Sequence, residues 1–192
     1  MPRKPRIEVA GGVFHVTVRV NNREWRFLAD GDRRLLLWTF ATAAKRCEWR
    51  VCAFCVMSNH AHFMLQTREP NLAVGMHWFG TAFARAFNRR HGRVGHFFEG
   101  RYGAVLIESD EHLLTASRYV VLNPVRAGLV SGPAEWPWSS YRATVGLAAK
   151  PRFLDDTPLL ELFSDDPFVA RARFVAFVAD GVEDPLLGRA IS

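Results

Sequence analysis

The chain has 192 residues, which suffices for one compact domain with a hydrophobic core but leaves little room for two. Hydrophobic residues make up 49% of it and aromatic residues 12%, and this composition excludes an intrinsically disordered chain. Its 25 Lys and Arg exceed its 19 Asp and Glu, and the formal charge of +6 suits a polyanionic partner, although many soluble proteins are mildly basic.

The sequence carries no membrane or secretory signal. No stretch approaches the roughly 20 consecutive apolar residues that span a bilayer, and no apolar signal core follows the basic residues 1–6. We therefore predict a cytoplasmic protein without membrane association. The three cysteines, Cys47, Cys52 and Cys55, are an odd number in one cluster, which argues against a disulfide framework.

The first part of the chain predicts three strands and one helix. Val, Thr and Phe alternate along its first strand, as is typical of a half-buried strand. The pair Ser58-Asn59 favours a tight turn, so the strands on its two sides form a hairpin. In chain order we predict a strand at 13–20, a helix at 33–46 capped by Asp30 or Asp32, and strands at 49–57 and 60–66.

A second, longer helix opens at residues 70–71 and reaches about His91, where Gly92 ends it. Its apolar residues recur every three or four positions and predict one buried stripe, whereas Arg85 and Arg89 lie on another face. The stripe consists of Leu72, Met76, Phe79, Phe83 and Phe87.

A fourth strand region at 95–107 contains glycines that predict a bend or bulge. Ser109 or Asp110 then caps a third helix that runs through about Leu122, and the following Asn123-Pro124 stops it.

The order strand, helix, strand, strand, helix, strand, helix is the split βαβ pattern of a ferredoxin-like α+β fold, an antiparallel sheet with its helices on one face. After Val145 the chain changes character, and Lys150-Pro151 resembles a linker. Residues 164–167 predict the start of a last helix that reaches about Asp180. We interpret this segment as an appended C-terminal helical tail, with Phe168, Phe174 and Val178 as its apolar contacts.

His60-Ala61-His62 is the most informative segment. Residues i and i+2 of a strand point to the same face, so both imidazoles leave the sheet side by side. Two convergent imidazoles hold a divalent metal if a third or fourth ligand comes from elsewhere. The alternative is that two histidines merely share an exposed strand face.

The cysteines offer a weaker metal site. Cys52 and Cys55 are three residues apart, so within a regular strand they point to opposite faces. A structural zinc site would require that strand to break, and buried packing of small side chains is the simpler interpretation.

Tyr119, near the end of the third helix, is a candidate nucleophile. Asn123 lies four residues on and shares its helix face, and Arg118 and Arg126 place positive charge nearby. A phenol keeps its proton at neutral pH, so it attacks a phosphodiester only with help from a cation or a base. From the residues alone, a core aromatic at a helix end is the simpler interpretation, and Tyr102 is the next candidate for the nucleophile.

Four segments resemble a known family. Residues 56–65 (VMSNHAHFML) resemble the metal-binding strand of the HUH endonuclease superfamily, most closely that of single-tyrosine transposases of the IS200 type. Residues 96–102 resemble the fourth-strand motif of that family, and residues 118–130 its catalytic helix and the turn after it. Residues 136–141, and the tail around 174–178, are similar to the branch called REP-associated tyrosine transposases.

The resemblance implies a site and a reaction. His60 and His62 would be metal ligands for Mg²⁺ or Mn²⁺, and Tyr119 the nucleophile that forms a 5′-phosphotyrosine link. Asn123 falls where relatives carry a polar third ligand, often the longer Gln, and Ala61 replaces the usual bulky residue between the histidines. Residues 1–148 would be the nuclease domain and residues 149–192 the tail.

The implied substrate is single-stranded DNA that carries a hairpin next to the cut site. Relatives of the short IS200 type pair up whereas the REP-associated branch acts alone, so we expect a monomer and keep a homodimer open. Exposed aromatic residues would stack on unpaired bases, with His77 and Trp78 as candidates. Basic residues that would contact phosphates are Arg3, Lys4, Arg6, Arg85, Arg89, Arg90, Arg93, Arg101, Arg118 and Arg126, each of which is individually compatible with a plain solvated surface.

Two other functions are compatible with parts of this pattern. The first is a non-catalytic protein that binds DNA or RNA hairpins, which would have no need for the histidine pair and the tyrosine together. The second is a structural zinc protein that combines the cysteines with His60 or His62.

Overall fold

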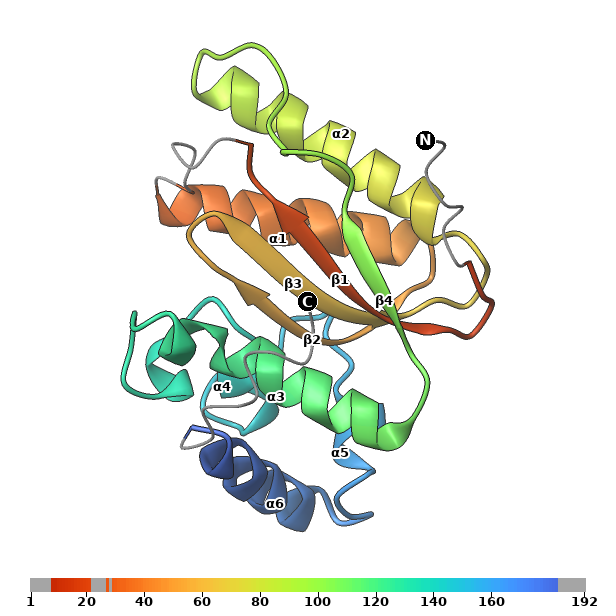
Figure 1. The fold of residues 1–192 in the computed structure, drawn as a ribbon, viewed down its shortest axis with the longest axis vertical. Coiled ribbons are helices and arrows are strands. Elements are labelled where there is room, and N and C mark those ends of the chain that lie inside the picture. Colours follow the sequence, from red (N-terminus) through yellow and green to blue (C-terminus); the bar gives the residue numbers. More distant parts are fainter. Residues whose placement is uncertain (1–7, 22–26, 28, 183–192) are drawn as a thin grey trace, which may run out of the picture.

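The computed structural model describes residues 8–21, 27 and 29–182 and has the α+β architecture that the sequence predicts (Figure 1). Among the described residues, no helix is both long enough and apolar enough to cross a lipid bilayer. The elements in chain order are β1 (Val13–Arg19), α1 (Asp30–Arg46), β2 (Arg50–Val56), β3 (His60–Gln66), α2 (Leu72–Arg90), β4 (Gly103–Ile107), α3 (Asp110–Arg126), the 3₁₀ turn η1 (Pro133–Glu135), α4 (Tyr141–Thr144), α5 (Thr157–Leu160) and α6 (Pro167–Asp180).

The strands form an antiparallel sheet in the order β2-β3-β1-β4, which is the order of a ferredoxin-like fold. In β1, Phe14, Val16 and Val18 belong to the main core, so the residues between them face the opposite side of the sheet. Thr17 of β1 lies directly opposite His62 of β3, and Arg19 lies opposite His60. This register decides which β1 side chains reach the two histidines.

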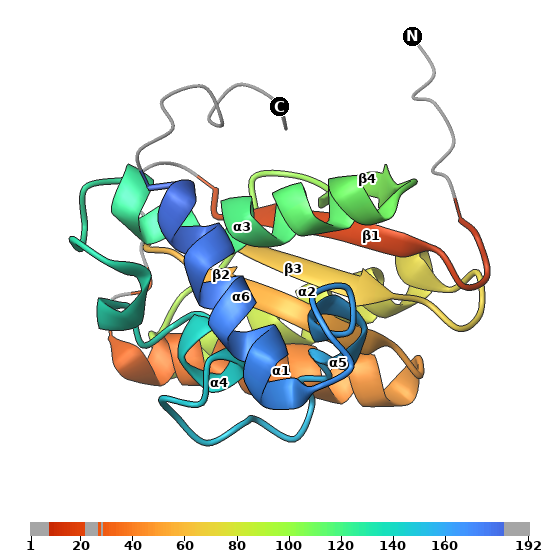
Figure 2. The ribbon, with the colours of Figure 1, turned by 90° about the horizontal axis from the view of Figure 1, so that it is seen from below.

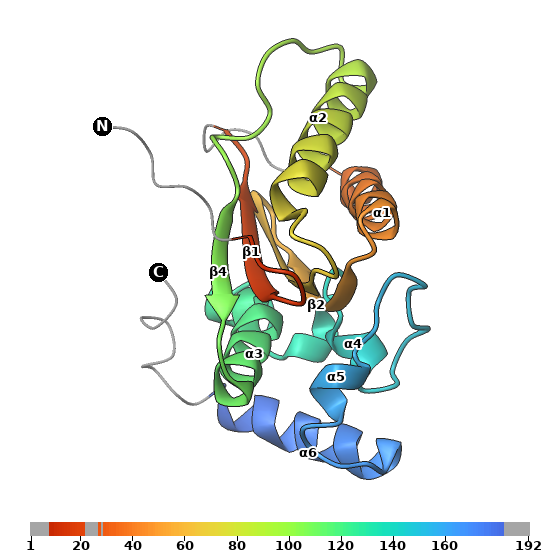
Figure 3. The same ribbon diagram turned by 90° about the vertical axis from the view of Figure 1, so that its right-hand side faces the viewer.

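Helices cover both faces of the sheet (Figures 2 and 3). The two helices of the split βαβ unit, α1 and α2, lie together on one face, as the sequence predicts. The whole apolar stripe of α2 is buried there, and Phe40 of α1 stacks on Phe63 of β3 with ring centroids 3.6 Å apart. The third helix, α3, lies on the opposite face and packs against β2, β3 and β4. The histidine face of the sheet is therefore covered by the helix that carries Tyr119.

Three element boundaries differ from the prediction. The helix α1 begins at Asp30, so its N-cap residue is Ala29, and the predicted caps Asp30 and Asp32 lie inside its first turn. The regular strand β4 begins only at Gly103, and residues 95–102 instead run irregularly beside β1, where Phe98 bridges Val20. Gly95 has a φ of 100°, a left-handed conformation that interrupts strand geometry. The helix α3 continues through Pro124 to Arg126, and burial of Pro124 offsets the lost hydrogen bond and the steric clash that a proline causes inside a helix.

The C-terminal segment packs against the rest of the molecule. Leu154 forms a bridge to Val51 of β2, and the N–H of Asp155 donates to the Val51 carbonyl at 2.8 Å. The Asp166 side chain caps α6, as the sequence predicts, by accepting the N–H groups of Phe168 and Val169. The predicted contact of Phe168 is wrong, because this side chain is 82% exposed. A boundary at residue 148 stays a prediction.

Phe174 and Val178, the other two predicted contacts of α6, are buried. They join Val121 and Leu122 of α3 in one apolar cluster. The tail therefore supports the outer side of the helix that carries Tyr119.

Candidate metal and nucleophile site

His60 and His62 leave β3 on the face that α3 covers, as the strand alternation predicts. Their ring centroids are 5.0 Å apart and the ring planes are nearly perpendicular, at 87°. The N–H of Met57 donates to the His60 carbonyl at 2.9 Å, which closes the turn through Ser58 and Asn59. The hairpin thus fixes the backbone position of the first histidine.

The two nitrogens of His62 have very different surroundings. The residue is only 4% exposed. Its Nδ1 lies 2.9 Å from Nε2 of His15 and 3.2 Å from Oγ1 of Thr17, both on β1. Its Nε2 is buried and has no hydrogen-bond partner among the described residues. A buried imidazole nitrogen that has no hydrogen-bond partner is available to coordinate a metal ion.

The three clustered histidines stay neutral well below neutral pH. Burial lowers the pKa of His62 to about 2, with the neighbouring His15, His60 and Arg19 adding to the effect. Burial likewise lowers the pKa of His60 to about 4 and that of His15 to about 4. A metal ligand must be a neutral imidazole, so these environments favour coordination over protonation.

Tyr119 and Asn123 approach the histidines from α3. The ring centroid of Tyr119 lies 5.6 Å from that of His62 and 5.9 Å from that of His15, both in edge-on contact. The Asn123 side chain lies near the His60 ring, where it opposes the lowering of the His60 pKa, and its Nδ2 donates to the Tyr119 carbonyl at 3.0 Å. Both predicted residues therefore share one helix turn that faces the histidine pair.

The donor set fits a divalent cation bound by two imidazoles and an amide oxygen. No group of three or more His, Cys, Asp or Glu that would hold a metal occurs among the described residues. A site with two histidine ligands needs at least a third ligand. Asn123, which lies near His60, is the side chain that would provide it. An amide oxygen suits Mg²⁺ and Mn²⁺, which prefer oxygen ligands, whereas imidazoles more often bind other transition metals, so the choice of Mg²⁺ or Mn²⁺ stays a prediction from the family resemblance.

The cysteines are free thiols. The prediction that Cys52 and Cys55 point to opposite faces is wrong, because a register shift between Val51 and Ala53 interrupts the alternation of β2. Both thiols pack in the cluster beneath α3, and burial raises the pKa of the Cys52 thiol to about 12. They are protonated packing residues, which does not favour a structural zinc site.

Arg118 and Arg126 flank Tyr119 in sequence, but only one lies against its ring. The Arg126 guanidinium lies 5.4 Å from the Tyr119 ring centroid. The Arg118 guanidinium instead lies 4.3 Å from the Phe177 ring centroid and donates to the Phe177 carbonyl at 3.4 Å, so it packs on α6. Of these two arginines, Arg126 is therefore the one that places positive charge beside the Tyr119 ring.

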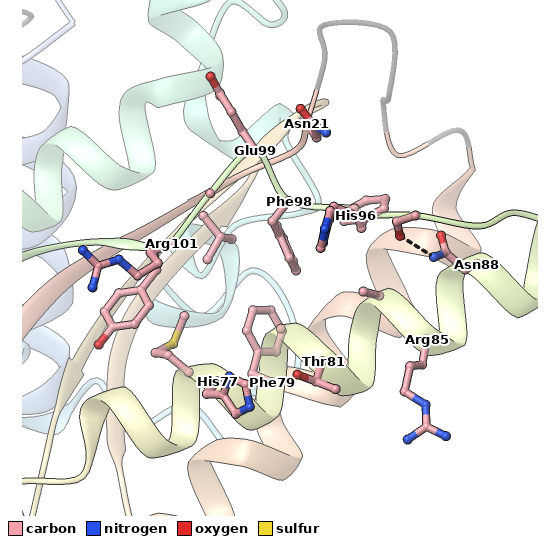
Figure 4. Close-up of a pocket in the computed structure, with 18 of the residues that line it drawn as sticks. Asn21, His77, Phe79, Thr81, Arg85, Asn88, His96, Phe98, Glu99 and Arg101 are labelled. Atoms are coloured by element: carbon pink, nitrogen blue, oxygen red, sulfur yellow. Dashed lines mark hydrogen bonds between the residues drawn. The ribbon is translucent and has the colours of Figure 1, made fainter.

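Several other predicted DNA contacts gather around a cavity of about 800 Å³ between α2 and residues 95–102 (Figure 4). Arg85, Arg101 and His77 line it, together with aromatic side chains such as Phe98. Tyr102 also lines this cavity, on the α2 side of the sheet, and so does not join the histidine pair.

The remaining basic residues are dispersed. Arg89 is exposed on α2, and Arg93 borders a smaller cavity beside Asn88. The Nε atom of Arg90 lies 3.6 Å from the Asp32 carboxylate, which makes Arg90 part of the contact between α1 and α2. Arg3, Lys4 and Arg6 lie outside the described residues.

Sequence reasoning missed His15 and Thr17. Both lie on the face of β1 that looks toward α3, and their period-two spacing in the predicted first strand was the available signal. The spacing does not reveal the register of β1 against β3, and it is this register that places His15 and Thr17 beside His62.

Comparisons with known proteins show the family and the fold. The family described as “Transposase IS200 like” matches residues 8–123. A protein of Haemophilus influenzae named “Putative REP-associated tyrosine transposase” is 26% identical over 170 residues, which span 81% of this chain and 94% of that protein. A solved structure of a REP-associated tyrosine transposase bound to a REP hairpin matches with a TM-score of 0.68 at 20% identity, over 82% of this chain and 94% of that one, and so shares the fold. Because the family match spans more than half of the chain, this protein belongs to the IS200-like transposase family.

Proposed function

We propose that this protein cuts and rejoins single-stranded DNA that carries a hairpin, with Tyr119 as nucleophile and Mg²⁺ or Mn²⁺ as cofactor. The observation that carries the proposal is the contact between the rings of Tyr119 and His62, whose centroids lie 5.6 Å apart. The Nε2 atom of the same His62 has no hydrogen-bond partner among the described residues. A core aromatic would need neither the histidine pair nor that nitrogen.

In the proposed reaction, the Tyr119 oxygen attacks the scissile phosphate in line. An oxygen–phosphorus bond forms to tyrosine, and the bond from phosphorus to the 3′ oxygen breaks. The phenolic proton passes to solvent, and the departing 3′ oxygen takes up a proton to become a hydroxyl. The 5′-phosphotyrosine keeps the energy of the phosphodiester, so attack by another 3′ hydroxyl rejoins DNA without a nucleotide cofactor.

The residues around Tyr119 would each have a separate task. His60, His62 and Asn123 would hold a divalent cation, which would supply Lewis-acid stabilisation of the charge that grows on the phosphate. The Arg126 guanidinium beside the Tyr119 ring adds a fixed positive charge next to the attacking group. Burial keeps both imidazoles neutral and available as ligands.

The cavity beside α2 is our candidate for holding DNA near the cut. It combines aromatic side chains, which stack on unpaired bases, with Arg85 and Arg101, which suit phosphates. The cavity wall is connected to the metal site through β1. The N–H of Glu99, in the wall, donates to the Arg19 carbonyl, and Arg19 lies directly opposite His60 in the pairing of β1 with β3. A DNA strand that passes the end of β1 near Arg19 would contact both places. The related structure named as bound to a REP hairpin supports a hairpin as the partner.

We further propose that one chain is sufficient for cleavage, since Tyr119, His60 and His62 approach one another within one chain. Mixing a Tyr119→Phe variant with a His62→Ala variant tests this point. A site shared between two subunits would regain activity in the mixture, whereas a site within one chain would not.

The decisive experiment incubates a labelled hairpin oligonucleotide with Mn²⁺ and separates protein–DNA adducts under denaturing conditions. We expect wild-type protein to form a covalent adduct that EDTA prevents. Tyr119→Phe should abolish the adduct while hairpin affinity survives, because the ring remains and only the attacking oxygen is lost.

Tyr102→Phe is the matched control, since it removes a hydroxyl from the α2 side of the sheet. It should leave the adduct in place. A Tyr119→Phe protein that still cuts at the wild-type rate would remove Tyr119 from the reaction. A wild-type protein that binds the hairpin but never cuts it would favour the alternative of a non-catalytic hairpin-binding protein.

A further inference from the structure

The β1 side of the site contains two polar side chains that the proposed chemistry does not use. His15 is 3% exposed and Thr17 is half-buried, and both contact the same nitrogen of His62. We propose that His15 and Thr17 are positioning residues that hold the proton of His62 on Nδ1 and so present its Nε2 lone pair to the cation. The inference rests on the proposed metal site.

The fold fixes this contact from three directions. Thr17 lies directly opposite His62 in the antiparallel register, and His15 occupies the neighbouring position on the same face of β1. The His15 and His62 rings are stacked, with centroids 5.1 Å apart and planes 24° apart. The edge of the Tyr119 ring closes the remaining side. The His62 ring is therefore held in one orientation.

The hydrogen-bond possibilities decide which nitrogen carries the proton. A neutral imidazole has one N–H and one lone pair, and its tautomer follows the partners that each nitrogen finds. With the proton on Nε2, His62 would bury an N–H that finds no acceptor among the described residues, which is unfavourable. With the proton on Nδ1, the N–H donates to His15 Nε2 or Thr17 Oγ1.

The favoured tautomer is also the one that a metal requires. A ligating imidazole coordinates through one nitrogen while the other donates a hydrogen bond that fixes the ring. His15 and Thr17 provide two acceptors for that bond on a rigid central strand. The pair therefore prepares His62 for the cation before any cation arrives.

The first test measures the tautomer directly, without metal or DNA. Two-bond ¹H–¹⁵N correlation spectra of the protein with labelled histidine distinguish a protonated ring nitrogen from one with a lone pair. The His62 signals are assigned by their loss in a His62→Gln variant. We expect wild-type His62 to be protonated at Nδ1 and to carry its lone pair at Nε2. Protonation at Nε2 in the wild type would overturn the proposal.

The second test measures Mn²⁺ affinity in the absence of DNA by electron paramagnetic resonance of unbound Mn²⁺. The double variant His15→Phe/Thr17→Val removes both acceptors and keeps the bulk of both side chains. We expect its affinity to fall by about 10- to 100-fold, as is usual when a hydrogen-bond partner of a metal ligand is lost. The single variant His15→Gln should bind Mn²⁺ with the wild-type affinity, because the amide oxygen of glutamine takes the place of the His15 Nε2 as acceptor.

Thr42→Val is the matched control, since it removes a threonine hydroxyl from α1 that bonds only its own helix, to the Trp38 carbonyl. It should not change the affinity. If the double variant fails to fold in a thermal melt, the wild-type tautomer and the comparison of Thr17→Val with Thr17→Ser decide. Wild-type affinity in a folded double variant would contradict the inference. The wild type could instead show the expected tautomer, and bind Mn²⁺ more tightly than the double variant, without cutting DNA. That result would contradict the proposed function alone.

Discussion

Asn123 illustrates how a single side chain connects two elements of the site. Its Nδ2 is bound to the Tyr119 carbonyl of its own helix, which leaves the amide oxygen side for contact with His60. The amide thus connects the helix turn of Tyr119 to the side of the site where His60 lies. This arrangement also compensates for the short reach of Asn, because α3 already brings the residue close enough to affect the pKa of the His60 ring.

Replacing Asn123 tests whether it is the third ligand. Asn123→Ala should lower Mn²⁺ affinity about tenfold or more, since the loss of even an indirect partner commonly costs that much. Asn123→Asp keeps an oxygen in place and adds a negative charge, so it should bind Mn²⁺ at least as tightly as the wild type. Isothermal titration with Mn²⁺ gives both values, and equal affinity in the alanine variant would exclude Asn123 from the coordination sphere.

The residue pairs that local spacing controls were predictable, and the others were not. His60 and His62 face one side because they are two apart in a strand, and Tyr119 and Asn123 face one side because they are four apart in a helix. His15 was missed because its contact with His62 spans 47 residues and depends on strand register. The roles of these residues as ligands and nucleophile remain predictions.

At the scale of elements, the strongly periodic segments were predicted well. The stripe of α2 is buried in full, and β3 has its predicted bounds of His60 to Gln66. The errors fall where tertiary packing overrides a local rule. Burial of Pro124 lets α3 continue past the predicted stop, and the bulge in β2 turns Cys52 and Cys55 to one side of the sheet. Neither effect leaves a mark on the sequence.

The helix α2 contains two glycines whose replacement by alanine should have opposite effects. A Cβ atom at Gly75 would lie 2.3 Å from the Trp49 ring and 2.7 Å from the Cys47 sulfur. Because these neighbours are packed between α2 and the sheet, we expect Gly75→Ala to destabilise the protein by about 1–3 kcal/mol. Urea unfolding followed by circular dichroism measures the change.

Gly80→Ala is the matched control in the same helix. The nearest atom to a Cβ at Gly80 is 3.8 Å away, in the Phe98 ring, which is an ordinary contact. Alanine should therefore stabilise the protein by about 0.5–1 kcal/mol through its higher helix propensity. Equal effects of the two substitutions would mean that helix propensity, and not the close approach of α2 to Trp49, dominates at Gly75.

At the scale of the whole molecule, the site lies between the sheet and the helix that covers one of its two faces. The face of the sheet that carries the histidines is closed by α3, and α3 is in turn supported by Phe174 and Val178 of α6. The opposite face is filled by α1 and α2, whose aromatic residues form the larger core. Neutral histidines are thus enclosed in the folded state, which links stability to pH.

The direction of this link follows from the pKa values. In the unfolded chain a histidine takes up a proton below about pH 6.5. In the folded protein His15 and His60 resist protonation until about pH 4, and His62 until about pH 2. Between these limits the unfolded state binds more protons, so the free energy of unfolding decreases as the pH falls from 6.5 toward 4. Above pH 6.5 these groups contribute no pH dependence.

Each such histidine should contribute up to about 1.4 kcal/mol per pH unit to the slope within that window. Carboxylates elsewhere add their own slope, so the comparison with His15→Gln isolates one histidine. Urea unfolding at a series of pH values, in EDTA, should give a shallower slope for this variant between pH 6.5 and 4, by about one proton. Parallel curves for the two proteins would show that His15 is protonated in the folded state, and the enclosed, neutral histidine cluster would then be wrong.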